Sequence, residues 1–234
     1  MITKDQNNAC RKVGEEALLN AEWQEYGEYC INREKGLRKK AFIHLDNFLK
    51  STLSWDFAKK KSFVKWLCDK MDTISSADYG PYPTPLSKKL LGPVFDEWIE
   101  KEPDNAEAYA LKAQYTADFD SYLDAIKIDS NNQRARIALA RECVSAIWYS
   151  THHLPEYFIG EEQKMIGKMS EAKEHIAYLH EGPLKDDVIK DLQLEAQLLR
   201  DWMQFKSEGA NNFDQWCTNK GRRYEWIKAY YYDE

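Results

Sequence analysis

Apolar residues recur at helical spacing along almost the whole chain, and this periodicity constrains the fold more than any other feature. The clearest run follows the i, i+3, i+4 and i+7 spacing of one helix face: Val188, Ile189, Leu192, Ala196, Leu199 and Met203. No stretch shows the apolar–polar alternation of a half-buried strand. The 234 residues include only 10 Gly and 7 Pro, too few for an all-β fold with its many turns. The sequence therefore predicts an all-α protein of about ten helices.

One segment interrupts the helical pattern. Residues 75–87, SSADYGPYPTPLS, contain three Pro and one Gly, and Pro both removes a backbone donor and restricts the residue before it. We expect a linker here, between an N-terminal helical layer (1–74) and a second helical section (88–234). The second section is expected to end in a capping helix over residues 212–230, and the whole chain to form one continuous structural unit.

The cysteines and the N-terminus predict a cytoplasmic protein. The five Cys, at positions 10, 30, 68, 143 and 217, are scattered, odd in number and free of any C-x-x-C pair, which favours reduced thiols over a disulfide framework or a zinc site. The first residues, MITKDQNNACRKVGEE, lack the apolar core of a secretory signal. No apolar run reaches the roughly 20 residues of a membrane span.

The charge is acidic overall, with a net of −6, but it is uneven. Residues 1–70 carry more Lys and Arg than Asp and Glu, whereas the remainder is acidic. A solvated helix surface accounts for this pattern; a basic protein partner for the acidic part is the sharper interpretation. Direct binding to nucleic acid is disfavoured, because such proteins are more usually basic overall.

Two blocks in the middle of the chain repeat one another. When Pro103-Asp104-Asn105 is aligned with Ser130-Asn131-Asn132, Ala108 meets Ala135 and Ala113 meets Ala140. Each block reads as the end of one helix, a tight corner, and a new helix whose small residues allow a neighbour to approach closely. The chain is therefore expected to contain antiparallel helical hairpins stacked on one another.

These blocks resemble tetratricopeptide repeats over roughly residues 95–145. EPDNAEAYALKA is similar to the corner and first helix of that family, and YLDAIKIDSNN to its second helix and the next corner. Tyr109, Ala113 and Ala125 match its structural positions. The blocks are offset by 27 residues where the family repeat has 34, Lys112 stands at a usual Leu position and Ser130 replaces Pro. The resemblance implies an irregular solenoid or bundle, a fold used mostly as a binding scaffold.

No motif for catalysis, metal binding or cofactor binding is found. The five His lack the spacing of H-E-x-x-H or Glu-x-x-His sites. Gly160…Gly167-Lys168 has the wrong spacing for a phosphate loop and Met169 where Ser or Thr belongs. Cys143 or Cys217 with a distant His is a combination that most proteins offer. We therefore predict no catalytic residue, no metal and no cofactor; an enzyme whose site is assembled only by folding is the alternative.

The C-terminal segment is the candidate partner surface. It is the densest aromatic stretch of the chain and also carries two arginines, and Trp, Tyr and Arg are the residue types enriched at binding hot spots. The competing interpretation is that these aromatics form a core or cap that closes a helical stack. The candidate partner-binding residues are Trp216, Arg222, Arg223, Tyr224, Trp226, Tyr230 and Tyr231.

The function favoured by this reasoning is a non-catalytic, protein-binding module in the cytoplasm. Within that class we favour a toxin-neutralising protein of the immunity type, because an acidic module without reaction motifs suits that task. A general adaptor or scaffold is the first alternative. An enzyme with an unrecognised site is the second.

Overall fold

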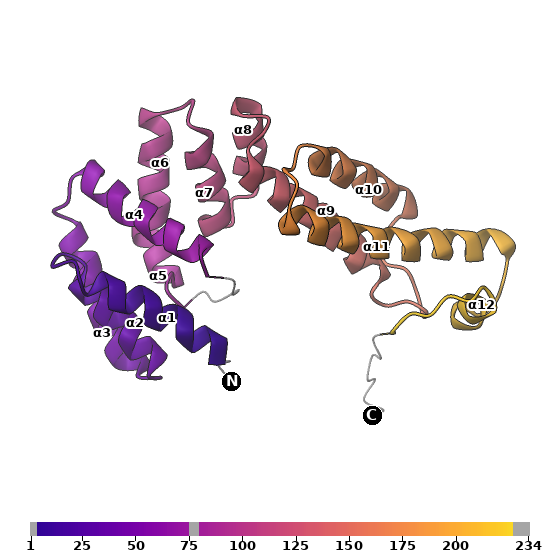
Figure 1. The fold of residues 1–234 in the computed structure, drawn as a ribbon, viewed down its shortest axis with the longest axis horizontal. Helices are drawn as coiled ribbons and strands as arrows, with labels where there is room; N and C mark the ends of the chain where they lie inside the picture. Colours follow the sequence, from indigo (N-terminus) through magenta and orange to yellow (C-terminus); the bar gives the residue numbers. More distant parts are fainter. Residues whose placement is uncertain (1–3, 75–79, 227–234) are drawn as a thin grey trace. The chain divides into compact units, whose positions relative to one another are not determined.

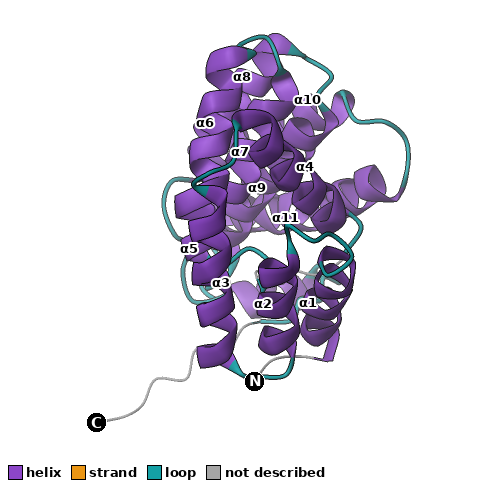
Figure 2. Cartoon of the chain, turned by 90° about the vertical axis from the view of Figure 1, so that its left-hand side faces the viewer, coloured by secondary structure: helices purple, strands orange, loops and turns teal. Residues whose placement is uncertain are grey.

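The computed structural model describes residues 4–74 and 80–226, and within them every regular element is helical (Figures 1 and 2). This confirms the predicted all-α class. The chain divides into two compact units, Met1–Ile128 and Asp129–Glu234. Residues 80–87, the described part of the expected linker, lie in the first unit, and residues 75–79 lie outside the described ranges.

The first unit is built from the following helices: α1 (Lys4–Ala17), α2 (Gln24–Glu34), α3 (Arg38–Thr52), α4 (Phe57–Asp72), α5 (Thr84–Leu86), the π-helical turn η1 (Ser87–Leu91), α6 (Gly92–Lys101), α7 (Ala106–Thr116) and α8 (Asp120–Ile128). The second unit is built from α9 (Gln133–Thr151), α10 (Glu162–Ala177), α11 (Pro183–Glu208) and α12 (Phe213–Asn219).

The first two helices pack closely because each carries a glycine at the contact. A Cβ added at Gly27 of α2 would lie 2.8 Å from Leu18 Cγ and 3.0 Å from Gly14 O of α1. A Cβ added at Gly14 would lie 2.9 Å from Cys30 Cβ. These distances are shorter than ordinary contacts in a packed interior, so the two backbones can come this close only without side chains.

The core of the first unit holds the described end of the Pro-rich segment in place. Tyr26 is fully buried beside the rings of Phe48 and Phe63. Its hydroxyl donates to the carbonyl oxygen of Pro81 at 2.5 Å, and the Tyr29 hydroxyl donates to that of Gly80 at 2.6 Å. Buried hydroxyl groups require a partner, so these two bonds join the segment to the core.

A π-helical turn precedes Gly92-Pro93. Pro93 has no N–H to donate to the preceding turn. The N–H of Gly92 bonds to the carbonyl oxygen of Ser87, five residues earlier, which widens the helix at that turn. The Ser87 hydroxyl donates to Tyr115 O of α7 at 2.8 Å. The widened turn therefore lets α5, η1 and α6 follow one another and contact α7.

Lys112 lies on α7, at a position where the repeat pattern usually has leucine, and it forms two ion pairs. The Lys112 ammonium lies 3.0 Å from a carboxylate oxygen of Asp96 on α6 and 3.1 Å from one of Asp118 at the corner after α7. Asn105 caps α7 by accepting a hydrogen bond from the N–H of Glu107. Ala117 ends the helix in the left-handed conformation at φ 59°. Lys112 therefore joins two helices through charge where a leucine would join them by burial.

In the second unit α9, α10 and α11 lie side by side (Figure 1). Asn132 caps α9 by accepting a hydrogen bond from the N–H of Ala135, and Gly182-Pro183 forms the corner before α11. The side chains between the helices form one apolar cluster. Its buried members are Ala140, Cys143, Val144, Ile147, Ala172, Ile176, Leu179, Val188, Leu192 and Leu199.

A buried arginine–histidine pair joins α9 to α10. One terminal nitrogen of the Arg136 guanidinium donates to His175 Nδ1 at 3.0 Å, and the guanidinium lies over the Tyr178 ring at 3.9 Å. The two residues are each 5% exposed, and His175 Nε2 finds no hydrogen-bond partner among the residues that the structure describes. Burial lowers the pKa of His175, and the neighbouring Arg136 charge lowers it further.

The last helix is shorter than the sequence suggests. We expect a helix over 212–230, but α12 ends at Asn219 and residues 222–226 have no regular structure. Gly221 adopts a left-handed φ of 70°, the conformation that ends many helices. The start is as expected, because Asn212 accepts a hydrogen bond from the N–H of Gln215.

We expect Gly27→Ala to destabilise the first unit by about 1–3 kcal/mol, the range for overpacking a close contact. The matched control is Gly167→Ala in α10, where an added Cβ meets no atom within 4 Å. This control should raise stability by up to about 1 kcal/mol, because Ala favours the helix over Gly. Chemical denaturation of both variants tests this pair, and equal effects on stability would contradict the close contact.

We expect the second unit to lose stability as the pH falls below about 6.5, because the unfolded chain then binds a proton at His175 before the folded chain does. The contribution of neutral His175 to the free energy of unfolding is present above the unfolded pKa and is lost as the pH falls through the lower, folded pKa. Thermal melts across this range should show a shallower pH dependence for His175→Gln than for wild type. Identical slopes would show that His175 is not the group responsible.

Candidate partner-binding surfaces

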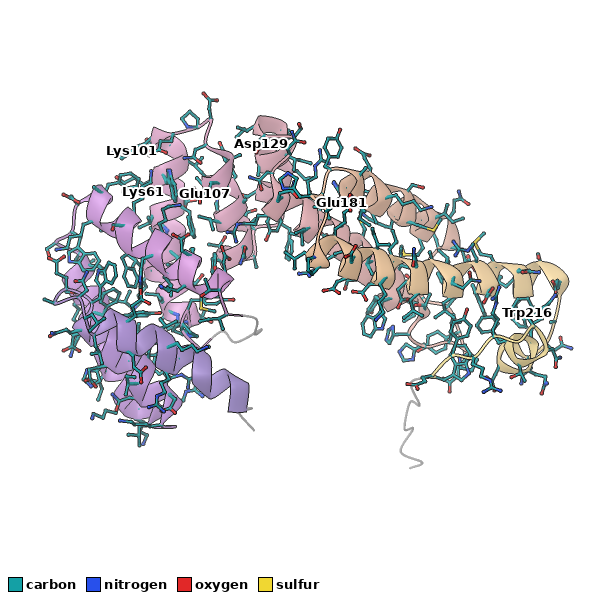
Figure 3. All side chains as sticks on the ribbon, in the orientation of Figure 1. Lys61, Lys101, Glu107, Asp129, Glu181 and Trp216 are labelled. Carbon is teal, nitrogen blue, oxygen red and sulfur yellow. The ribbon has the colours of Figure 1, made fainter. Side chains whose placement is uncertain are left out.

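The predicted C-terminal aromatics form a packed cluster at the end of α11. Trp216 is only 7% exposed, and its ring stacks on Phe213 with a centroid distance of 6.0 Å. Its indole nitrogen donates to a Glu208 carboxylate oxygen at 2.6 Å. Figure 3 shows Trp216 beside the C-terminal end of α11. The structure thus places this residue in the packing between α11 and α12.

Two further predicted residues converge on Asp201 of α11. The Tyr224 hydroxyl donates to Asp201 Oδ2 at 2.5 Å, and the Arg222 Nε lies 3.3 Å from the same oxygen. Asp201 itself is only 3% exposed. Burial raises the pKa of Tyr224, and the hydrogen bond to Asp201 raises it further. These contacts fasten the segment after α12 to α11.

Of the remaining candidates, Trp226 is partly buried, Arg223 is exposed, and two lie outside the described residues. The indole nitrogen of Trp226 donates to Asp214 Oδ1 at 2.5 Å, and its ring packs against Tyr224. Arg223 is exposed. Tyr230 and Tyr231 lie outside the described residues. The structure therefore brings Trp216, Tyr224 and Trp226 together around α12.

A second surface, not identified from the sequence, is the groove between α9 and α11. It has a volume of about 340 Å³. We call it the α9/α11 groove and define it by the residues that line it: Arg141, Val144, Ser145 and Trp148 from α9, with Val188, Asp191, Leu194 and Glu195 from α11.

The two helices that form the groove run in the same direction. At the start of α9, Gln133 bonds to the backbone of Tyr178 and His180, just before α11 begins. Near the end of α9, the Thr151 hydroxyl donates to Glu195 Oε2 at 2.9 Å. Residues spaced three and four apart on each helix share a face, so both helices present a continuous row to the groove.

Large apolar side chains along this groove remain exposed. Trp148 is 45% exposed and Leu194 is 59% exposed. Leu194 lies off the periodic apolar face of α11. This off-face position is the one feature of the sequence that could have indicated an exposed leucine here. An isolated exposed leucine needs no explanation, but exposed apolar residues that share a groove indicate a contact surface.

An aromatic row continues from the groove past the end of α9. The Trp148 ring stacks on His152 at a centroid distance of 4.9 Å. His152 contacts His153 at 4.2 Å, and His153 stacks on Tyr157 at 4.8 Å. Tyr157 is 45% exposed. The groove and this row together present aromatic rings to a partner, the residue type most enriched at hot spots.

Glu195 is the buried charged group of the groove. It is 9% exposed, and among the described residues the one hydrogen bond to its carboxylate comes from Thr151. Burial raises the pKa of Glu195, and the nearby Asp191 charge also raises it. A carboxylate in this setting is disfavoured in its ionised form, and such groups are found more often at functional sites than elsewhere.

The remaining features give no support to a reactive centre in the described ranges. Burial raises the pKa of Cys143 to about 12 and that of Cys217 to about 11, so both thiols are protonated near neutral pH, unlike nucleophilic cysteines. Across residues 4–74 and 80–226, no group of three or more His, Cys, Asp or Glu is arranged to hold a metal ion. In the same ranges no helix has the length and apolar character needed to cross a membrane.

Comparison of the chain with models of known protein families, with curated proteins and with solved structures finds no match.

We expect Glu195→Gln to raise the melting temperature at pH 7. Burial raises the pKa of Glu195 in the folded state above its value in the unfolded chain. Protonated Glu195 therefore contributes to the free energy of unfolding in full below the unfolded pKa, and this contribution is lost as the pH rises through the higher, folded pKa. Glutamine stays uncharged and can still accept from Thr151. The difference from wild type should vanish at acidic pH, where Glu195 is itself protonated.

The matched control for this measurement is Glu174→Gln, on the exposed surface of α10. Its effect should stay within about 0.5 kcal/mol, as for most surface substitutions. A lower melting temperature for Glu195→Gln at pH 7 would mean that the ionised carboxylate stabilises the fold.

Proposed function

We propose that this chain is a non-catalytic, protein-binding module and that the α9/α11 groove is its partner-binding site. The observation that carries the proposal is the exposure of Trp148 and Leu194 on either side of the groove. Val144 and Val188 supply its apolar lining, and Arg141, Asp191 and Glu195 supply its charges. Protein interfaces usually combine apolar and aromatic side chains with a smaller number of polar and charged groups.

The shape of the surface favours a protein over a small molecule. A volume of about 340 Å³ is near the lower limit for small-molecule sites. The exposed rings do not stop at the groove but continue through His152 and His153 to Tyr157. A partner helix or loop could follow this row, because such segments bind by placing successive side chains along a groove.

The C-terminal cluster is retained as a second contact in this proposal. Arg223 is exposed, and Trp226, three residues later, is partly exposed. However, the polar atoms of Trp216, Tyr224 and Trp226 are engaged by carboxylates of α11 and α12. We therefore assign this cluster chiefly to closing the helical stack, with its outer residues at the edge of a partner surface.

Within this class we propose neutralisation of a toxin protein. Support comes from the acidic charge of the chain, which would speed association with a basic partner, and from the lack of reaction motifs in its sequence. A general adaptor differs in a measurable way. A neutraliser should form one tight and stable complex, whereas an adaptor should bind several ligands with micromolar affinity.

We expect Trp148→Ala to weaken capture of the partner by at least about tenfold, the effect of losing a hot-spot tryptophan worth roughly 2 kcal/mol. The partner is first isolated by affinity purification from cells of the source organism and identified by mass spectrometry. Binding of the purified partner is then measured by calorimetry.

Two further variants make this test decisive. Trp226→Ala reports on the C-terminal cluster and should weaken binding less than Trp148→Ala does. Leu53→Ala removes an exposed leucine of the first unit, 82% exposed after α3, and should leave affinity unchanged. Full affinity for a folded Trp148→Ala variant would contradict the assignment of the groove. Turnover of a substrate that depends on one Glu, His or Cys would contradict the non-catalytic role.

A further inference from the structure

We propose that the α9/α11 groove recognises an arginine side chain of the partner, seated between the Trp148 ring and the carboxylates of Asp191 and Glu195. This inference rests on the proposed function, because it names the chemistry of the partner at the same site. The planar guanidinium is the cation that can both stack on an aromatic ring and pair with two carboxylates.

Two acidic residues of the groove lie close together without a basic partner among the described residues. Asp191 and Glu195 are four residues apart on α11, so their side chains lie on the same face of the helix. Both line the groove, and among the described residues no Lys or Arg forms an ion pair with either of them. Two carboxylates at this spacing repel each other. A bound cation would relieve that repulsion.

The largely buried carboxylate of Glu195 has unused capacity to accept hydrogen bonds. The residue is 9% exposed, and among the described residues its carboxylate receives one hydrogen bond, from Thr151, although a carboxylate can accept about four. Keeping a largely buried carboxylate ionised is unfavourable. A guanidinium has five N–H donors, so it would supply the hydrogen bonds that the groove leaves open.

Trp148 offers an exposed aromatic ring on which a cation can stack. Trp148 lines the groove with the two carboxylates, and His152 stacks on it at an interplanar angle of 21°. The ring is still 45% exposed. A cation placed over the face of an indole ring is attracted by the negative potential of that face, and the attraction is stronger where water is excluded. Leu194 and Val144 would meet an apolar residue next to the arginine.

The groove also excludes a uniformly basic partner segment. Arg141 lines the same groove seven residues before Trp148 on α9, which corresponds to about 10 Å along the helix. It would repel a second cation at that end. The favoured partner segment therefore carries one arginine with apolar neighbours, and does not consist of a run of basic residues.

The experiment uses the full chain and the probe peptide acetyl-Leu-Arg-Leu-amide, followed by NMR at the indole N–H of Trp148. The signal is assigned by its loss in Trp148→Phe. We expect saturable shifts with a dissociation constant on the order of 1 mM, as suits one stacking contact and pairing of one guanidinium with two partly solvated carboxylates. Replacing Arg by uncharged citrulline in the probe should weaken binding about tenfold or more.

Variants of the groove locate the charge contact. Glu195→Gln should weaken the arginine probe about tenfold and Asp191→Asn by a smaller factor, with little effect of either on the citrulline probe. Glu174→Gln on α10 should change nothing. If the arginine probe gives no shift at about 20 mM, well above the expected dissociation constant, the arginine inference is overturned.

Other outcomes separate this inference from the proposed function. Equal binding of the arginine and citrulline probes, or of wild type and Glu195→Gln, would overturn the arginine inference while leaving an apolar groove. Equal binding of a lysine probe would overturn the choice of arginine. Dimerisation of the chain that Glu195→Gln abolishes would make a second copy the occupant and overturn a separate partner. Unchanged partner capture by Trp148→Ala would overturn the proposed function itself.

Discussion

α9 and α11 run side by side in the same direction, and the candidate site depends on this packing. Val144 of α9 and Val188 of α11 belong to one apolar cluster, and contacts from Gln133 and Thr151 hold the two ends of α9 to α11 and the residues before it. Burial of the apolar stripe is the main stabilising contribution. It also places the residues beside each stripe along a common groove, so the fold and the site share one cause.

Buried polar groups in the second unit show two different arrangements. Asp201 is fully engaged, because it receives hydrogen bonds from Gln197 and Tyr224 and an ion pair from Arg222. Glu195 lies six residues earlier on the same helix, and within residues 4–74 and 80–226 its carboxylate accepts a hydrogen bond from Thr151 only. A satisfied network fixes a structure, whereas an incompletely satisfied carboxylate is less favourable in the free protein. This contrast separates a carboxylate that serves packing from one suited to binding.

The candidate site was only partly predictable. The C-terminal aromatics stand out in sequence because they are dense, and the structure shows that density reflects packing around Phe213 and Trp216 as much as exposure. Trp148 and Leu194 do not stand out, since each is a single apolar residue in a helix that already has an apolar face. The two residues line one groove only because α9 packs against α11. Short-range sequence patterns do not predict which helices pack together.

The amino-acid sequence by itself determined the all-α class and the start of the last helix, which Asn212 caps. These features depend on residues a few positions apart, where backbone sterics and local hydrogen bonds decide the conformation. Only the tertiary structure decided the early end of α12, the burial of Glu195 and the existence of the α9/α11 groove. Those properties depend on which helices become neighbours, and many residues acting together decide that.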